Sequence, residues 1–190
     1  MATRILVFAG SVRSGALSGR LAALAAKELA LADAEVTRIS LADYPLPLYD
    51  GDVEDNRGIP ENPGKLARLI VANQGVFIAT PEYNNSLPPL LKNAIDWVSR
   101  HRNTASLAYR HKVYAVGSTS DGAFGGARAL IDLRKVLMTG LRGIMVPEKI
   151  EIPRAQDAFD ESGELIDEGR AKLLRTVCRS LVDLASRLAD

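Results

Sequence analysis

Short aliphatic runs alternate with longer stretches of helical periodicity along the chain. The runs predict five strands, at Arg4–Ala9, Glu35–Ser40, Gly75–Thr80, Lys112–Gly117 and Gly143–Val146. Apolar residues at three- and four-residue spacing predict helices over about 18–32, 61–73, 88–99, 125–139 and 163–189. The runs ILVFA and GVFIA are continuous, which is typical of buried central strands. Strict strand–helix alternation therefore predicts an α/β fold with a parallel sheet covered on both faces.

Three connections lack helical period. The longest, Leu41–Asn62, is rich in Pro, Gly and Asp, and a structureless segment of that length is usually a functional loop or a partner contact. Residues 101–111 and 151–162 are expected to be polar connections. The two histidines, His101 and His111, fall in the first of these and are expected to be solvent-exposed loop residues rather than metal ligands.

Composition and charge narrow the class of protein. With 190 residues, 47% of them hydrophobic, the chain is expected to form one domain over residues 1–190 without disulfides or metals. A net charge of +1 removes the electrostatic basis for nucleic-acid binding. Cys178 lies on an apolar helical stripe and is expected to be buried and inert. The N-terminal apolar run is too short for a signal peptide or a membrane span, so we expect a cytoplasmic protein without a membrane partner.

The loop after the first predicted strand has the composition of a phosphate site. In parallel α/β sheets, ligands bind beyond the carboxyl ends of the strands. Residues Gly10–Ser18 lead directly into a helix, whose N-terminus offers unpaired N–H groups and a partial positive charge. Ser11 and Ser18 can donate hydroxyl hydrogen bonds, and Arg13 can bind a phosphate through two N–H groups. The alternative is an ordinary strand–helix turn in which Ser18 is the N-cap.

Two common nucleotide loops do not fit this segment. Gly10 and Gly15 have the spacing of a Walker A loop, but Ala16 and Leu17 occupy the positions that require Lys and Ser or Thr. The dinucleotide pattern G-x-G-x-x-G fails directly after Gly10. An NTPase is therefore disfavoured, and a loop lined by hydroxyls and an arginine, suited to a monophosphate, remains.

The loop after the third predicted strand is suited to a flat polar ring. Ser86 and the two prolines that follow Leu87 predict a helix start. Before that start, Glu82–Asn84 can project amides and side chains toward a planar heterocycle, and such donors tune the electronics of a flavin. The alternative is a Pro-rich loop in front of a capped amphipathic helix. Ile95 and Trp97 are expected in the core or an interface rather than against a ring.

The segment from Pro81 to Arg100 closely resembles the signature of the NADPH-dependent FMN reductases, a family that includes quinone, chromate and azo-dye reductases. Its matching positions are Pro81, Glu82, Tyr83, Asn84, Ser86, Pro88, Leu91, Lys92, Asn93, Ala94, Ile95, Asp96, Trp97, Ser99 and Arg100. Further matches are Gly10, Ser11 and Arg13 in the phosphate motif, Gly117–Arg128 in the third flavin loop, and Ala158–Asp160 with Leu165–Asp167 near the C-terminus. The resemblance thus covers nearly the whole chain.

The resemblance implies a flavodoxin-like, doubly wound sheet of five strands in the order 2-1-3-4-5 that binds FMN non-covalently. It implies ping-pong electron transfer from NADPH or NADH to quinones or similar small acceptors, such as azo dyes, chromate or free flavin. Because the cofactor carries the chemistry, no catalytic side chain and no metal are expected. The implied FMN phosphate ligands are Ser11, Arg13, Ser18 and the backbone of Ala16 and Leu17; the implied ring ligands are Pro81, Glu82, Tyr83 and Asn84, with Ser118 at the far edge.

One position departs from the family's pattern. The family often has a serine where this chain has Ala16, and the loss of one hydroxyl is expected to weaken phosphate binding by about 0.5–1.5 kcal/mol. Family members commonly assemble as dimers or tetramers, so a homo-oligomer is expected. The candidate contacts are the Leu41–Asn62 segment, the helix over about 88–99 and the pair Arg128 and Glu148.

Other functions remain open on the sequence alone. A flavodoxin-type electron carrier would bind FMN and dock to protein partners, but such docking favours a strongly acidic surface, and the net charge here is +1. An organoarsenical oxidase of the same family is a further alternative, as is a regulatory domain that has lost FMN. Nucleophilic catalysis is disfavoured because the chain has no G-x-S-x-G elbow and neither histidine lies in the three loops.

Overall fold

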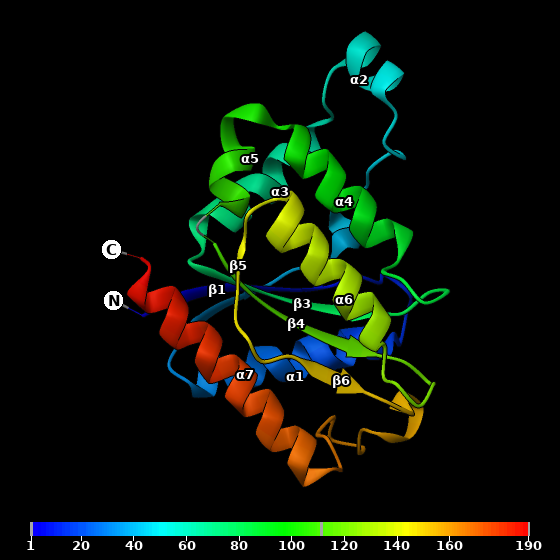
Figure 1. The fold of residues 1–190 in the computed structure, drawn as a ribbon, viewed down its shortest axis with the longest axis vertical. Coiled ribbons are helices and arrows are strands. Elements are labelled where there is room, and N and C mark those ends of the chain that lie inside the picture. Colours follow the sequence, from blue (N-terminus) through cyan, green and yellow to red (C-terminus); the bar gives the residue numbers. More distant parts are fainter. Residues whose placement is uncertain (1, 111, 190) are drawn as a thin grey trace.

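The computed structural model describes residues 2–110 and 112–189, which form a central sheet between two layers of helices (Figure 1). His111 lies outside the described residues. The strands are β1 (Arg4–Ala9), β2 (Glu35–Arg38), β3 (Gly75–Pro81), β4 (Val113–Thr119), β5 (Ile144–Met145) and β6 (Ile150–Ile152). They are parallel and lie in the order β2-β1-β3-β4-β5, with β6 also paired to β4. This confirms the flavodoxin-like order that the resemblance implies.

The fifth place in the sheet is filled by two short strands rather than one. β5 pairs with Val113 and Tyr114 at the start of β4, and β6 pairs with the end of β4 over Gly117–Thr119. Pro147 lies between the two strands, and proline cannot donate a ladder hydrogen bond. The expectation of a polar connection from residue 151 onward was therefore wrong at its start, because Ile152 is a buried strand residue.

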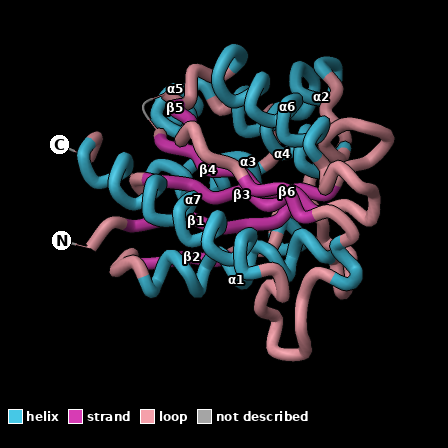
Figure 2. Tube along the Cα trace, turned by 60° about the horizontal axis from the view of Figure 1, so that its bottom comes forward, coloured by secondary structure: helices cyan, strands magenta, loops and turns pink. Residues whose placement is uncertain are grey.

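Helices cover both faces of the sheet. They are α1 (Leu17–Leu31), α2 (Gly51–Arg57), α3 (Glu61–Ala72), α4 (Pro89–Arg100), α5 (Arg102–Tyr109), α6 (Ala127–Lys135) and α7 (Glu168–Arg187). Figure 2 shows α1 and α7 on one side of the sheet and α3, α4 and α6 on the other. The strands alternate accordingly: Ile5 and Val7 of β1 belong to the core under α1 and α7, whereas Leu6 and Phe8 belong to the core under α3 and α4.

Two predictions about buried side chains are confirmed, one for Cys178 and one for Ile95 and Trp97. Cys178 is fully buried, and its burial raises the pKa of the thiol far above its usual value, which favours the inert form. Trp97 is also fully buried, and Ile95 is nearly so. Ile95 belongs to the core under α3 and α4, whereas Trp97 lies against the Leu41–Asn62 segment, where its ring contacts that of Tyr49 edge-on with the centroids 5.0 Å apart.

The segment Leu41–Asn62 is not structureless, contrary to expectation. It contains a 3-10 turn (Leu41–Asp43) and α2, which buries none of its own residues and stands apart from the sheet in Figure 1. Side chains of α4 hold the segment in place: the Trp97 indole N–H donates to the Pro47 carbonyl at 2.8 Å, and Arg100 pairs with Glu54 at 2.8 Å. These long-range contacts explain why no local periodicity revealed the segment's order.

Residues 101–110 also differ from the expected polar connection, because α5 follows α4 almost directly. The α5 sequence RNTASLAY mixes strong helix formers with Asn, Thr, Ser and Tyr and is only eight residues long, so its apolar spacing gave no clear sequence signal. His101 lies between the two helices and is half-buried, and its Nδ1 makes a hydrogen bond with the Thr104 hydroxyl. The expectation that His101 is an exposed loop residue was therefore wrong.

Candidate functional site

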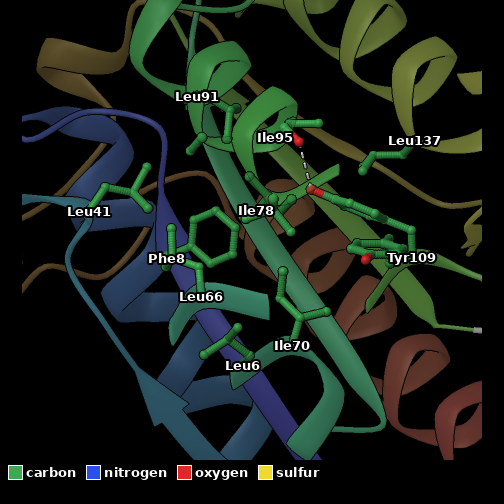
Figure 3. Close-up of a pocket in the computed structure, with 13 residues that line it drawn as sticks. Leu6, Phe8, Leu41, Leu66, Ile70, Ile78, Leu91, Ile95, Tyr109 and Leu137 are labelled. Carbon is green, nitrogen blue, oxygen red and sulfur yellow. Dashed lines mark hydrogen bonds between the residues drawn. The ribbon is translucent and has the colours of Figure 1, made fainter. Parts of the chain in front are cut away.

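The apolar core under α3 and α4 contains a cavity that is too small to be a cofactor site. Its volume is about 20 Å³, and its walls include Phe8, Leu91 and Tyr109 (Figure 3). The Tyr109 hydroxyl points across α4 and donates to the Ile95 carbonyl at 3.0 Å. Small-molecule sites usually measure several hundred cubic ångströms, whereas this space would hold about one water. It is a packing gap between the sheet and its covering helices.

A larger pocket lies at the carboxyl ends of β1, β3 and β4. Its volume is about 350 Å³, and three loops form its walls. The lining residues are Ser11, Arg13, Ala16, Leu17, Ser18, Pro81, Glu82, Tyr83, Thr119, Ser120 and Asp121. The structure therefore brings together eight of the ten residues that the sequence predicted as FMN ligands. Asn84 and Ser118 are not among the lining residues.

One end of the pocket is formed by the N-terminus of α1, where unpaired donors gather. Ala16 is the N-cap residue and makes no side-chain cap hydrogen bond, so the alternative in which Ser18 is the N-cap was wrong. Among the described residues, the N–H groups of Leu17 and Ser18 have no acceptor. The Ser18 hydroxyl is buried, at 1% exposure of the residue, and it also has no partner in the described chain. Buried polar groups are normally satisfied, so this turn offers unused donors of the kind that bind an anion at a helix N-terminus.

Arg13 and Ser11 form the outer wall of this end. The Arg13 N–H donates to the Ser11 hydroxyl oxygen at 3.3 Å, and the Arg13 carbonyl accepts from the Ala16 N–H at 3.1 Å. The backbone N–H of Ala16 is therefore already used, and the free amides are those of Leu17 and Ser18. The Arg13 side chain is exposed and makes no ion pair within the described residues. Its guanidinium is available to an anion at the helix N-terminus.

The loop after β3 forms the second wall, and its tip is a tight turn. Tyr83 and Ser86 exchange two backbone hydrogen bonds, of 2.9 and 3.0 Å. Between them, Asn84 and Asn85 have φ angles of 48° and 63°, the pattern of a type I′ turn, which favours asparagine. Asn84 is exposed at the tip of this turn, which explains its absence from the pocket lining.

The helix that follows this loop begins at Pro89, close to the predicted start and with a proline in its first turn, but Ser86 does not cap it. Pro88 is the N-cap residue of α4, and the Ser86 hydroxyl instead donates to Asp132 on α6 at 2.6 Å. The Glu82 carboxylate also reaches α6, where it accepts from the N–H groups of Arg128 and Ala129, both at 3.0 Å. The second wall of the pocket is thus bonded to α6 at two points.

The loop after β4 forms the third wall. Ser118 is fully buried, and its hydroxyl donates to the Gly125 carbonyl at 2.7 Å, so it holds the loop's shape from within. The next three residues, Thr119, Ser120 and Asp121, line the pocket and were missed as individual ligands. The sequence signal was present, because all three belong to the segment that resembles the third flavin loop. Pro81 pairs with Thr119 at the ends of β3 and β4, so the walls after these two strands start side by side at the sheet edge.

Residues 2–110 and 112–189 contain no group of three or more His, Cys, Asp or Glu side chains placed to hold a metal ion. No helix in these two ranges is both long enough and apolar enough to cross a bilayer.

Known proteins resemble this chain over nearly its full length. Residues 3–157 match the model of the NADPH-dependent FMN reductase family. A quinone reductase of Escherichia coli K12 is 38% identical over 170 residues, which cover 87% of this chain and 86% of that protein. An NAD(P)H-dependent FMN reductase of Pseudomonas aeruginosa is 34% identical over 180 residues, covering 94% and 92% of the two chains.

The fold agrees with these matches. The solved structure of FerB, a flavoenzyme NAD(P)H:(acceptor) oxidoreductase from Paracoccus denitrificans, is 29% identical in sequence and superposes with a TM-score of 0.79. That superposition covers 98% of both chains. Matched sequence, sheet order and pocket together show that this chain belongs to the NADPH-dependent FMN reductase family.

Proposed function

We propose that this protein binds FMN in the pocket at the carboxyl ends of β1, β3 and β4 and acts as an NAD(P)H-dependent quinone reductase. The observation that carries the proposal is the buried, unpartnered Ser18 hydroxyl beside two free amides and Arg13. These hydrogen-bond donors have no acceptor in the described chain. A phosphate monoester would supply acceptor oxygens for them and a negative charge for Arg13 and the helix N-terminus. When bound, FMN supplies the chemistry: it accepts a hydride from a nicotinamide and returns the electrons to a second substrate.

One group of residues would bind the phosphate of FMN. Ser11, Arg13, Ser18 and the Leu17 amide would hold the phosphate, and Ala16 lines the site beside them. Ala16 has a methyl group where the family often has a serine, so the site has one hydroxyl donor fewer. The free N–H groups of Leu17 and Ser18 would still donate to the phosphate.

The flavin ring would lie between the other two walls. Pro81, Glu82 and Tyr83 form one of them, and Thr119, Ser120 and Asp121 form the other. Asn84 and Ser118 would support these walls through the turn and the loop that they stabilise. Tyr83 is 47% exposed and borders the entrance, where a nicotinamide and then a flat acceptor would approach in ping-pong order.

Quinones are the acceptors that we propose first. The relatives include a quinone reductase of Escherichia coli and a 2-hydroxy-1,4-benzoquinone reductase of a Burkholderia species, the latter 33% identical over 176 residues. Azo dyes, chromate and free flavin are secondary candidates that the same exposed entrance would admit. We also propose that residues 1–190 form one domain, because α7 and β6 pack on the same sheet as the N-terminal strands. A cytoplasmic location is a separate proposal, which rests on the short N-terminal apolar run.

The proposed assembly is a homo-oligomer, either a dimer or a homotetramer. Three exposed apolar side chains lie on α6 or beside its ends: Phe124 in the turn before the helix is 66% exposed, Ile131 in the helix 62%, and Met138 in the helical extension at its end 46%. Within the described chain, Arg128 and Glu148 form no ion pair with each other, and one buried carboxylate oxygen of Glu148 has no partner. If the two residues pair, they do so between chains. Sedimentation equilibrium on the wild type and on Ile131→Glu tests this proposal.

Anaerobic titration tests the proposed reaction. The purified protein should show a flavin absorption spectrum, or acquire one when FMN is added, and NADPH or NADH should bleach it. Addition of a benzoquinone should then restore the spectrum. A protein that takes up no FMN would refute the proposal. A flavoprotein that NADPH and NADH fail to bleach would instead be an electron carrier.

A further inference from the structure

The pocket wall after β3 is fastened by two of its side chains to α6, the helix that follows the wall after β4. Glu82, next to Pro81 at the end of β3, accepts hydrogen bonds of 3.0 Å from two amides in the first turn of α6. Ser86, at the other end of the same hairpin turn, donates to Asp132 one turn further along α6. We name Glu82, Ser86 and Asp132 the loop–helix clamp.

Glu82, the first part of the clamp, caps the N-terminus of α6, which has no capping side chain of its own. The N-cap residue of α6 is Gly126, which offers no side chain and has a φ angle of 86°. A Cβ atom at this position would lie 2.8 Å from the Ser118 Cβ atom, so the start of α6 must be a glycine to press against β4. The acceptor for the orphan amides therefore comes from Glu82. A carboxylate at a helix N-terminus is favoured by both the hydrogen bonds and the helix dipole.

The second half of the clamp stabilises the type I′ turn. The Ser86 hydroxyl bond, at 2.6 Å, is the main cause that lowers the pKa of the Asp132 carboxyl below its ordinary value. Lys135 adds to the same effect from the neighbouring turn of α6. The bond fixes the base of the turn, and Tyr83, which lines the pocket, lies at that base.

We infer that Glu82 serves the reaction as a positioning residue, through the clamp, and that its carboxylate is not a direct ligand of the flavin. The clamp fixes the Pro81–Tyr83 wall to α6. Because α6 begins at Ala127, at the end of the loop that contains Thr119–Asp121, the clamp also fixes the separation between these two walls. This inference rests on the proposed FMN site. It extends that site to Ser86 and Asp132, neither of which lines the pocket.

Two substitutions at Glu82 separate geometry from charge. Glu82→Gln keeps a carbonyl oxygen that can accept from both α6 amides but removes the negative charge, whereas Glu82→Ala leaves both amides unpaired. If the clamp positions the walls, Glu82→Ala should weaken FMN binding by the apoprotein about tenfold or more, and Glu82→Gln should bind within about threefold of the wild type. The midpoint potential of bound FMN should move to more positive values in Glu82→Gln, because a nearby anion no longer opposes the charge of the reduced ring.

The other half of the clamp provides an independent arm. Ser86→Ala removes a hydroxyl that has no access to FMN, yet it should also weaken FMN binding, and its effect should be less than additive with that of Glu82→Ala. Ser99→Ala is the matched control, because the Ser99 hydroxyl makes an equally short bond of 2.6 Å to the Asp96 carbonyl, away from the pocket. FMN affinity is measured by quenching of flavin fluorescence, and hydrogen exchange at the Arg128 and Ala129 amides reports whether the cap is lost.

The outcomes distinguish this inference from the proposed function. Wild-type binding by Glu82→Ala, with faster exchange at the two amides, would overturn the clamp and leave the proposed function intact. Equal losses of affinity in Glu82→Gln and Glu82→Ala would also overturn it, because the carboxylate would then act on the flavin directly. Failure of the wild-type protein to bind FMN would refute the proposed function, and the clamp's role in it would fall as well.

Discussion

Ser18→Ala should make the apoprotein more stable and its complex with FMN weaker, a pair of opposite effects that follows from one hydroxyl. In the ligand-free chain, the Ser18 hydroxyl is buried and unpartnered among the described residues. An unsatisfied buried polar group costs about 1–3 kcal/mol, so its removal should raise the free energy of unfolding by a similar amount. For a chain of this size, each kcal/mol corresponds to roughly 2–4 °C in the melting temperature.

The same hydroxyl should donate to the FMN phosphate in the complex. A hydrogen bond to a charged group contributes about 1.5–3 kcal/mol, so Ser18→Ala should raise the dissociation constant of FMN roughly tenfold to a hundredfold. Scanning calorimetry of the apoprotein and a fluorescence titration with FMN measure the two effects on one preparation.

Two control variants isolate the hydroxyl's contribution. Alanine favours helices more than serine, and Ser180→Ala within α7 measures that effect alone, because Ser180 makes no side-chain hydrogen bond to any of the described residues. Ser14→Ala alters the same loop at an exposed position outside the pocket lining and should leave FMN binding unchanged. A less stable Ser18→Ala apoprotein, or one that binds FMN as tightly as the wild type, would refute the assignment of Ser18 to the phosphate.

Further predictions concern other parts of the chain. Arg13→Lys keeps the charge but loses the two-pronged grip, so FMN should bind about tenfold more weakly, as a fluorescence titration would show; unchanged affinity would exclude Arg13 as a phosphate ligand. Lys112 donates to the carbonyls of Val71 and Asn73 at 2.9 and 2.6 Å, so Lys112→Met should destabilise the fold at pH 7 by about 1–3 kcal/mol in urea unfolding. Burial, then a neighbouring arginine, lowers the pKa of Lys112 in the folded state below 10.5. The unfolded chain therefore binds more protons in that range, and the pH-dependent part of the wild-type stability should rise as pH increases toward 10.5; a flat difference between wild type and Lys112→Met would contradict this. Cys178 should react with a thiol reagent at neutral pH only after unfolding, and rapid labelling of the native protein would contradict its burial.

The sequence was sufficient for features that depend on local pattern. Continuous apolar runs located β1 and β3, and serine and arginine after β1 indicated residues that line one end of the pocket, the end that we propose for the phosphate. It was insufficient where order comes from distant contacts. Nothing near α2 reports that Trp97 and Arg100 hold its segment on α4. Likewise, Glu82 caps a helix 46 residues away along the chain, which no motif spacing could reveal.

The two ends of the pocket, the proposed phosphate end at Ser18 and the proposed ring end at Glu82, contribute to FMN affinity in different ways. At the phosphate end, the Ser18 hydroxyl and two amides are left unpaired until an anion arrives, so this end reduces the stability of the apoprotein and adds affinity on binding. At the ring end, Glu82 and Ser86 already have their partners on α6, so the walls are ordered before the ligand enters and less entropy is lost on binding. FMN at a hundred times its dissociation constant should therefore stabilise the wild type by about 2.7 kcal/mol. At that same FMN concentration, Ser18→Ala and Glu82→Ala should both show a smaller gain, because both bind FMN more weakly, but they start from opposite sides of the wild type: Ser18→Ala from a more stable apoprotein and Glu82→Ala from a less stable one.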